Sequence, residues 1–183
     1  MDIRPEIQIQ SMVKAMIDVV LPAVDPAHKM AQEQARLIIG TLQLIAQRLP
    51  IAYRYDCDEL RRYVALAHAL LAGTKETLDP DTQAELARLA TQGRQLLTGA
   101  CSEPADVEAA AFALRAAVSH GVQQACSVGS TQVKQAVRRL VLDAAKIELE
   151  RERSLVMGMG FETDVSKRPR PIEEQLPPHT AVQ

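Results

Sequence analysis

The residues best suited to directed hydrogen bonding lie together between positions 53 and 63. This segment holds all three tyrosines of the chain, together with three arginines and three acidic residues. Tyrosine and arginine are favoured at recognition surfaces because they combine a large contact area with oriented donors. The segment therefore predicts a site for a protein partner or an anionic ligand, and its candidate binding residues are Tyr53, Arg54, Tyr55, Arg61 and Arg62.

The same segment also has a purely structural interpretation. Asp56 or Asp58 would cap the first turn of a helix, Tyr63 would pack inward, and the arginines would pair with nearby acids. The two interpretations differ in where the first two tyrosines and the arginine between them make their contacts. Burial of these side chains against the chain itself would remove support for a binding site.

The histidines and cysteines show no pattern typical of a metal site. No Glu-x-x-His motif occurs, and Cys57, Cys101 and Cys126 lack the paired spacing of zinc ligands. We therefore expect no cofactor, no metal and reduced thiols. An enzyme that uses His120, Cys126 or the tyrosine segment is the third hypothesis for function, and it requires two of these side chains to meet in a cleft.

Composition excludes several classes of protein. The 21 basic and 23 acidic residues are spread evenly, without the basic stripe that nucleic-acid binding needs. No apolar run approaches the roughly 18 residues of a membrane span, and the first residues lack the layout of a signal peptide. We expect a cytoplasmic protein that binds neither nucleic acid nor membrane.

The prolines indicate the elements that must position these residues. Proline is tolerated in the first helical turn and excluded from helix interiors, so regularly spaced prolines mark helix ends. Aromatic residues make up only 3% of the chain, which favours packed helices over sheets. The pattern predicts an all-α fold: an up-and-down bundle of about six helices over residues 1–157, with an extended or disordered tail over residues 158–183. The prolines concerned are Pro5, Pro22, Pro26, Pro50, Pro80 and Pro104.

Apolar residues at helical spacing fill the intervals between the prolines. The second predicted helix has Asp25 as its cap, and its broad apolar stripe predicts a place at the centre of the bundle. Asp79 with Pro80 predicts the start of the fourth helix in the same way. The expected helices are 5–21, 26–49, a third that starts between 50 and 58 and ends at 73, 80–98, 104–128, and 131–157.

One ridge of the fifth predicted helix consists of small residues at every fourth position. Such a ridge allows a second helix to approach closely, either across a dimer axis or inside a single bundle. Alanine is the best helix former, so the internal contact also accounts for most of the pattern. The candidate helix-packing or dimer residues are Ala109, Ala113, Ala117, Gly121 and Ala125.

These observations favour a non-enzymatic helical interaction or accessory protein that self-associates as a homodimer and has a possible further protein partner. The alternative is a protein that holds a small apolar ligand, such as an acyl chain, between helices. Methionine suits adaptable apolar pockets, so Met12, Met16 and Met30 would line that site.

Overall fold

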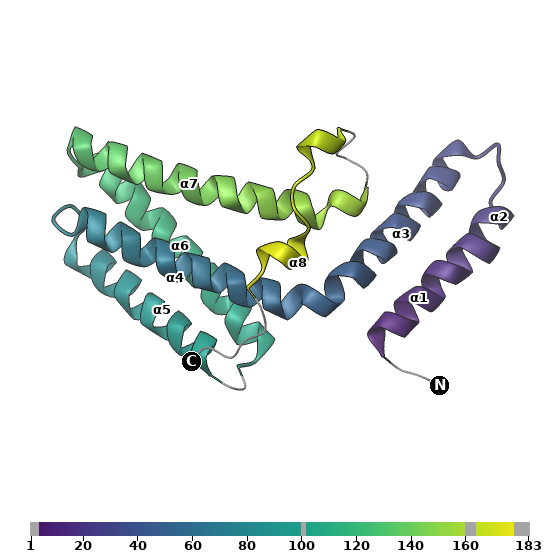
Figure 1. The fold of residues 1–183 in the computed structure, drawn as a ribbon, viewed down its shortest axis with the longest axis horizontal. Coiled ribbons are helices and arrows are strands. Elements are labelled where there is room, and N and C mark those ends of the chain that lie inside the picture. Colours follow the sequence, from purple (N-terminus) through teal and green to yellow (C-terminus); the bar gives the residue numbers. More distant parts are fainter. Residues whose placement is uncertain (1–3, 100–101, 160–163, 178–183) are drawn as a thin grey trace. The chain divides into compact units, whose positions relative to one another are not determined.

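The computed structural model describes residues 4–99, 102–159 and 164–177. All regular elements in these ranges are helical, and no strand occurs in them (Figure 1). The predicted all-α helical bundle is therefore confirmed.

The chain divides into two compact units, Met1–Ala52 with Glu152–Arg170, and Tyr53–Arg151 with Pro171–Gln183. The first unit is built on a helical hairpin. Its elements are α1 (Pro5–Ala15), the π-helical turn η1 (Met16–Val20), α2 (Leu21–Ala23), α3 (Lys29–Arg48) and the 3-10 turns η2 (Leu49–Ile51), η3 (Met157–Met159) and η4 (Val165–Lys167). The second unit is built on α4 (Ala52–Thr74), α5 (Pro80–Thr98), α6 (Pro104–Val128), α7 (Thr131–Leu155) and α8 (Ile172–Gln175), except that Ala52 and the last turn of α7 from Glu152 belong to the first unit.

Proline chemistry explains the helix starts and one irregular turn. Pro5, Pro80 and Pro104 each occupy the first turn of a helix, where a missing N–H has no intrahelical partner to lose. Pro22 instead follows a continuous helical run and cannot donate to the carbonyl of Asp18. The preceding turn widens into η1, in which the Leu21 N–H donates to the Met16 carbonyl.

The two predicted aspartate caps have different outcomes. The Asp79 carboxylate accepts the N–H of Thr82 at 2.8 Å and caps α5, as predicted. The prediction for Asp25 was wrong, because α3 begins at Lys29. The Asp25 carboxylate accepts the N–H of Ala27 at 2.8 Å, which closes a tight turn before the helix begins.

The second predicted helix, α3, is not at the centre of a bundle. It packs against α1, and at its C-terminal end against η3. Among the described residues of α3 only Ala35, Ile39 and Leu44 are buried. The broad apolar stripe of α3 predicted burial against two neighbouring helices. One edge of the stripe contacts α1, and the other edge is exposed.

The core of the second unit joins α4, α5, α6 and α7. Figure 1 shows that successive helices reverse direction, in the up-and-down manner expected for short connections. Leu60 of α4, Leu86 of α5 and Leu114 of α6 are fully buried, and Val137 brings α7 into the same cluster. A Cβ added at Gly93 would lie 2.9 Å from Val64, so α5 approaches α4 closely at this position.

The described part of the predicted tail, residues 164–177, contains η4 and the short helix α8 joined by extended residues. Ile172 and Leu176 are buried. The boundary predicted between residues 157 and 158 stays a prediction, and residues 160–163 and 178–183 of the tail lie outside the described ranges.

Candidate functional site

A buried ionic network links α4 and α7 in the second unit. Arg151 is fully buried and donates to Glu148 at 2.6 Å, and it lies 3.3 Å from the Asp58 carboxylate. Asp58 also accepts from Arg62 at 2.7 Å. The Arg151 guanidinium stacks 4.1 Å from the ring centre of Tyr55. The predicted tyrosine and arginine segment thus meets a partner helix that supplies the central cation.

Burial alters the acid–base chemistry of this network. It raises the pKa of Tyr55 to about 12, because a phenolate is disfavoured away from water and Arg151 only partly compensates. Burial likewise raises the pKa of Glu59, with Glu148 adding like-charge repulsion. The pKa of the Cys57 thiol is raised mainly by burial, which opposes formation of a thiolate nucleophile.

The first residues of the predicted binding segment make contacts within the second unit. Arg54 donates to the backbone carbonyls of Glu173 and Leu176 at 2.8 and 2.9 Å, and so holds α8. The Tyr53 hydroxyl donates to the Ser102 carbonyl at 3.1 Å. The Tyr55 hydroxyl lies 3.3 Å from Glu148. These bonds follow the structural interpretation of the segment, although Tyr53 remains 40% exposed.

The other predicted residues of the segment pair with one carboxylate. Arg61 lies 3.3 Å from Asp58 and Arg62 lies 2.7 Å from it. Asp58 is the seventh residue of α4, so it organises the ion network and does not cap the helix as expected. A binding role for the segment stays a prediction, and these internal bonds add no support to it.

The sequence prediction did not include Arg151 and Glu148; apolar spacing in this helix instead favours Val141 and Ile147 as inward-facing residues. The structure leaves those two apolar residues 36% and 46% exposed. One pattern in the sequence could have predicted the network. Residues spaced by three or four share one face of a helix, and on α7 this spacing extends from the apolar residues to two charged ones. This series runs through Val133, Val137, Leu140 and Ala144 to Glu148 and Arg151.

The small-residue ridge of α6 passes from exposed to buried along the helix. Ala109 is exposed, whereas Gly121 and Ala125 are buried. A Cβ added at Gly121 would lie 3.1 Å from Leu70 and 3.2 Å from Leu86. Gly121 therefore serves a close contact of α6 with α4 and α5, which is the internal alternative considered for this ridge. The remaining candidates, Ala113 and Ala117, are half-buried.

The candidate reactive groups are dispersed in the described ranges. No cluster of three or more histidine, cysteine, aspartate or glutamate side chains in these ranges could hold a metal ion. Cys126 and His120 are exposed on α6, and Cys57 is half-buried on α4. Cys101 lies outside the described residues.

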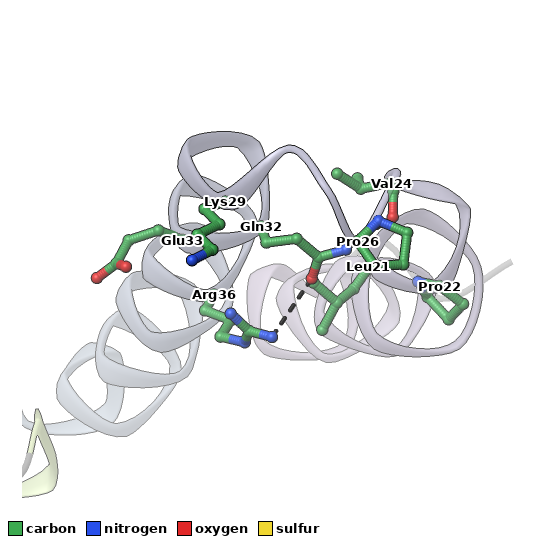
Figure 2. Close-up of a pocket in the computed structure, with 8 residues that line it drawn as sticks. All are labelled: Leu21, Pro22, Val24, Pro26, Lys29, Gln32, Glu33 and Arg36. Atoms are coloured by element: carbon green, nitrogen blue, oxygen red, sulfur yellow. Dashed lines mark hydrogen bonds between the residues drawn. The ribbon is translucent and has the colours of Figure 1, made fainter.

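An open pocket of about 510 Å³ lies at the turn of the α1–α3 hairpin (Figure 2). Leu21, Pro22, Val24 and Pro26 line one side, and Lys29, Gln32, Glu33 and Arg36 line the other. Gln32 donates to the Val24 carbonyl at 2.7 Å and so closes the turn. Half of the lining is polar or charged, unlike the apolar sites that hold acyl chains. The predicted pocket methionines lie elsewhere: Met12 and Met30 are 47% and 70% exposed.

The α1–α3 hairpin has a narrow apolar seam between its two helices. The seam residues of α1 are Ile9, Val13 and Met16, and those of α3 are Ala31, Ala35, Ile39, Leu42 and Ala46. Only Ala35 and Ile39 of this set are buried. The hairpin therefore removes little apolar surface from water by its own packing.

Beside the seam, each helix carries a second stripe that contains no charged residue. We call the two stripes together the uncharged face. On α1 and the turns that continue it, the stripe comprises Gln8, Met12, Ala15, Val19 and Ala23. On α3 it comprises Met30, Gln34, Leu37, Ile38, Thr41 and Ile45. Every one of these side chains is exposed.

The charged residues of the hairpin lie on other positions of the helices. Lys14 and Asp18 form an exposed pair at 2.6 Å on α1 and η1. On α3, Lys29 and Arg36 lie near Gln32, as Figure 2 shows. The uncharged face therefore lies opposite the ionic groups of the hairpin. On α3 it ends at Ile45, because Arg48 follows at the same helical spacing, and the charged side of the first helical segment also exposes Ile7 and Ile17.

Comparison with known protein families, characterised proteins and solved structures finds no match to this chain. No helix in the described part of the chain is both long enough and apolar enough to cross a membrane.

Proposed function

We propose that this chain is a non-enzymatic helical interaction protein that self-associates. The observation that supports this proposal most directly is the exposure of large apolar side chains in the first unit. Nine such side chains between residues 7 and 45 are at least 37% exposed, against three buried hydrophobic ones in the same region. The exposed set is Ile7, Met12, Ile17, Val19, Val20, Met30, Leu37, Ile38 and Ile45.

Isolated apolar side chains are common on protein surfaces and need no explanation. A contiguous apolar patch is different, because larger patches mark interaction sites on most soluble proteins. Several of the exposed side chains follow one another at spacings of three and four along α3, so they form a stripe. Covering this stripe would remove apolar surface from water and stabilise the hairpin.

The polar residues of the second unit support the same choice of surface. Arg54, Tyr55 and Arg151 direct their hydrogen bonds to groups of the same unit. Forming an interface there would break bonds already made inside the chain, and each broken buried bond has a cost. The apolar hairpin surface carries no such penalty.

Light scattering coupled to size-exclusion chromatography tests the proposal. We expect the mass of a dimer at high protein concentration, with a shift toward the monomer mass on dilution. The far-ultraviolet circular dichroism should remain helical throughout. A monomer mass at every concentration up to about 500 µM would contradict self-association, since even a weak specific dimer populates at that concentration.

A further inference from the structure

We propose that the uncharged face of the α1–α3 hairpin binds the same face of a second copy, so that the two hairpins form a four-helix bundle. This inference rests on the proposed function and names its surface and its partner.

The rotational positions of the two stripes place them on one side of the hairpin. At about 100° per residue, the stripe lies back from the seam residues by about 90° on the first helical segment and by about 110° on α3. The two helices of the hairpin run antiparallel (Figure 1). Viewed from one end of the hairpin, successive residues rotate clockwise in one helix and anticlockwise in its antiparallel neighbour. Because the two seams face each other, similar angles between seam and stripe place both stripes on the same side of the hairpin. One flat surface results, with Met12 and Val19 from the first helical segment and Ile38 and Ile45 from α3.

The size of this surface is sufficient for a dimer. The stripe of α3 from Met30 to Ile45 spans about 24 Å, and two adjacent helices are about 20 Å wide. Pairing two such faces covers on the order of 1,000 Å² in total, which is about the minimum expected of a biological interface.

The chemistry of the surface favours a second copy over a charged partner. A two-fold interface is self-complementary, so a charge on the face needs an opposite charge elsewhere on the same face as its partner. The exposed stripe of α3 from Met30 to Ile45 has no charge to repel its counterpart. Of the polar residues of that stripe, the Gln34 amide can both donate and accept, whereas the Thr41 hydroxyl already donates to the Leu37 carbonyl at 2.8 Å and retains the capacity to accept.

A four-helix bundle would also bury apolar side chains that the two-helix hairpin leaves exposed. A two-helix hairpin has a single seam, whereas a four-helix bundle encloses a core that is apolar on every helix. In such a bundle the seam residues and the uncharged face become adjacent parts of one core. Val13 and Ile39 would contribute from the seam, and Met12 and Ile38 from the uncharged face.

The first experiment is a matched pair of variants on α3. Leu37→Glu with Ile38→Glu introduces two charges at exposed positions near the middle of the uncharged face, so the monomer fold should tolerate them. Gln43→Glu adds charge at an exposed position on the other side of the same helix. We expect the first variant to raise the dimer dissociation constant at least about 100-fold and the control to change it less than about threefold.

The second experiment needs no substitution. Methyl groups of methionine are followed by nuclear magnetic resonance in the presence of a soluble paramagnetic agent, at high concentration and after dilution. The methyl groups of Met12 and Met30 should be shielded in the dimer and become accessible on dilution. Met16, which lies in the seam, should change less.

The outcomes separate this inference from the proposed function. If the wild-type chain dimerises but the Leu37→Glu/Ile38→Glu variant dimerises equally well, the hairpin face is wrong and self-association stands. If Met12 and Met30 stay accessible in a dimer, the same conclusion follows. If the wild-type chain is monomeric at all concentrations, both statements fail, and the exposed face belongs to a different partner.

Discussion

At the scale of single residues, Arg151 of the second unit is a charged side chain that is fully buried. A guanidinium that loses all contact with water must recover its solvation from fixed partners. Glu148, Asp58 and the face of Tyr55 supply most of it, yet the Arg151 Nε–H has no hydrogen-bond partner among the described residues. Arg151 therefore lacks one hydrogen bond, whereas Asp58 has two further arginine partners. Mutation of Arg151 and mutation of Asp58 should change stability by different amounts.

We predict that Asp58→Ala costs about 3 kcal/mol of unfolding free energy, whereas Arg151→Met costs about 1 kcal/mol or less. Removing Asp58 leaves a buried cation with one carboxylate, Glu148. Removing Arg151 leaves Asp58 with Arg61 and Arg62, which are partly exposed. Urea unfolding followed by circular dichroism measures both values. Equal losses would show that Arg62 does not compensate.

The cap of α5 makes a second prediction at this scale, on pH. Hydrogen bonds from the Thr82 backbone and from Gln124 to the Asp79 carboxylate lower the pKa of Asp79 from 3.8 to about 2. A depressed folded-state pKa means that the ionised carboxylate stabilises the fold above pH 4, and that this contribution is lost as the pH falls toward 2.

The variant Asp79→Asn keeps a capping oxygen and removes the titration. We expect the stability difference between wild type and this variant to be constant from pH 7 to pH 5 and to shrink between pH 4 and pH 2. Thermal unfolding at each pH measures the difference. A difference that is independent of pH down to pH 2 would contradict the assignment.

At the scale of elements, glycines set how closely α5 and α6 approach α4. The chain carries glycine inside both helices although glycine lowers helix stability. The reason is steric: at Gly93 and Gly121, leucine and valine side chains of neighbouring helices occupy the space of a Cβ. Helical propensity is given up at these positions for a shorter distance between helix axes.

We predict that Gly93→Ala destabilises the second unit by about 1–2 kcal/mol, because Val64, Leu60 and Leu114 would have to move from a closely packed core. Gly73→Ala on α4 is the control, since nothing lies within 4 Å of its added Cβ. It should be neutral or stabilising by less than about 1 kcal/mol. Chemical unfolding of the two variants provides the comparison. Stabilisation by Gly93→Ala would mean that the helices are free to separate.

At the scale of the whole molecule, the two units differ in how much of their apolar surface they bury. The second unit encloses leucines with no exposure at all, such as Leu60, Leu86 and Leu114. In the hairpin, Ile39 is the largest buried side chain of the seam. Local stability follows buried apolar contact, so the hairpin is the region that gains most from a partner.

We therefore predict that the stability of the hairpin depends on protein concentration and that of the second unit does not. Binding to the folded state slows opening by mass action. Hydrogen exchange of the Ile39 amide should slow as the concentration rises, while exchange of the Leu86 amide should stay constant. Identical behaviour of the two amides would indicate that the hairpin is not the associating element.

Features that depend on near neighbours in the chain were predictable. The helix starts at Pro80 and Pro104, the cap at Asp79 and the all-α architecture follow from proline geometry, capping chemistry and apolar spacing. The predicted helix cap at Asp25 was wrong because the Asp25 carboxylate accepts a hydrogen bond from a backbone N–H of its own turn, before the helix begins.

Features that depend on which segments meet were decided by the tertiary structure. The burial of Arg151 requires α7 to reach Asp58, which lies 93 positions earlier in the chain, and the role of Gly121 requires Leu70 and Leu86 to converge on it. The sequence of α3 showed how broad its apolar stripe is. It did not show how much of that stripe α1 would cover. Spacing along a helix fixes which residues share a face, because the helix is locally determined. What that face contacts depends on the packing of distant segments.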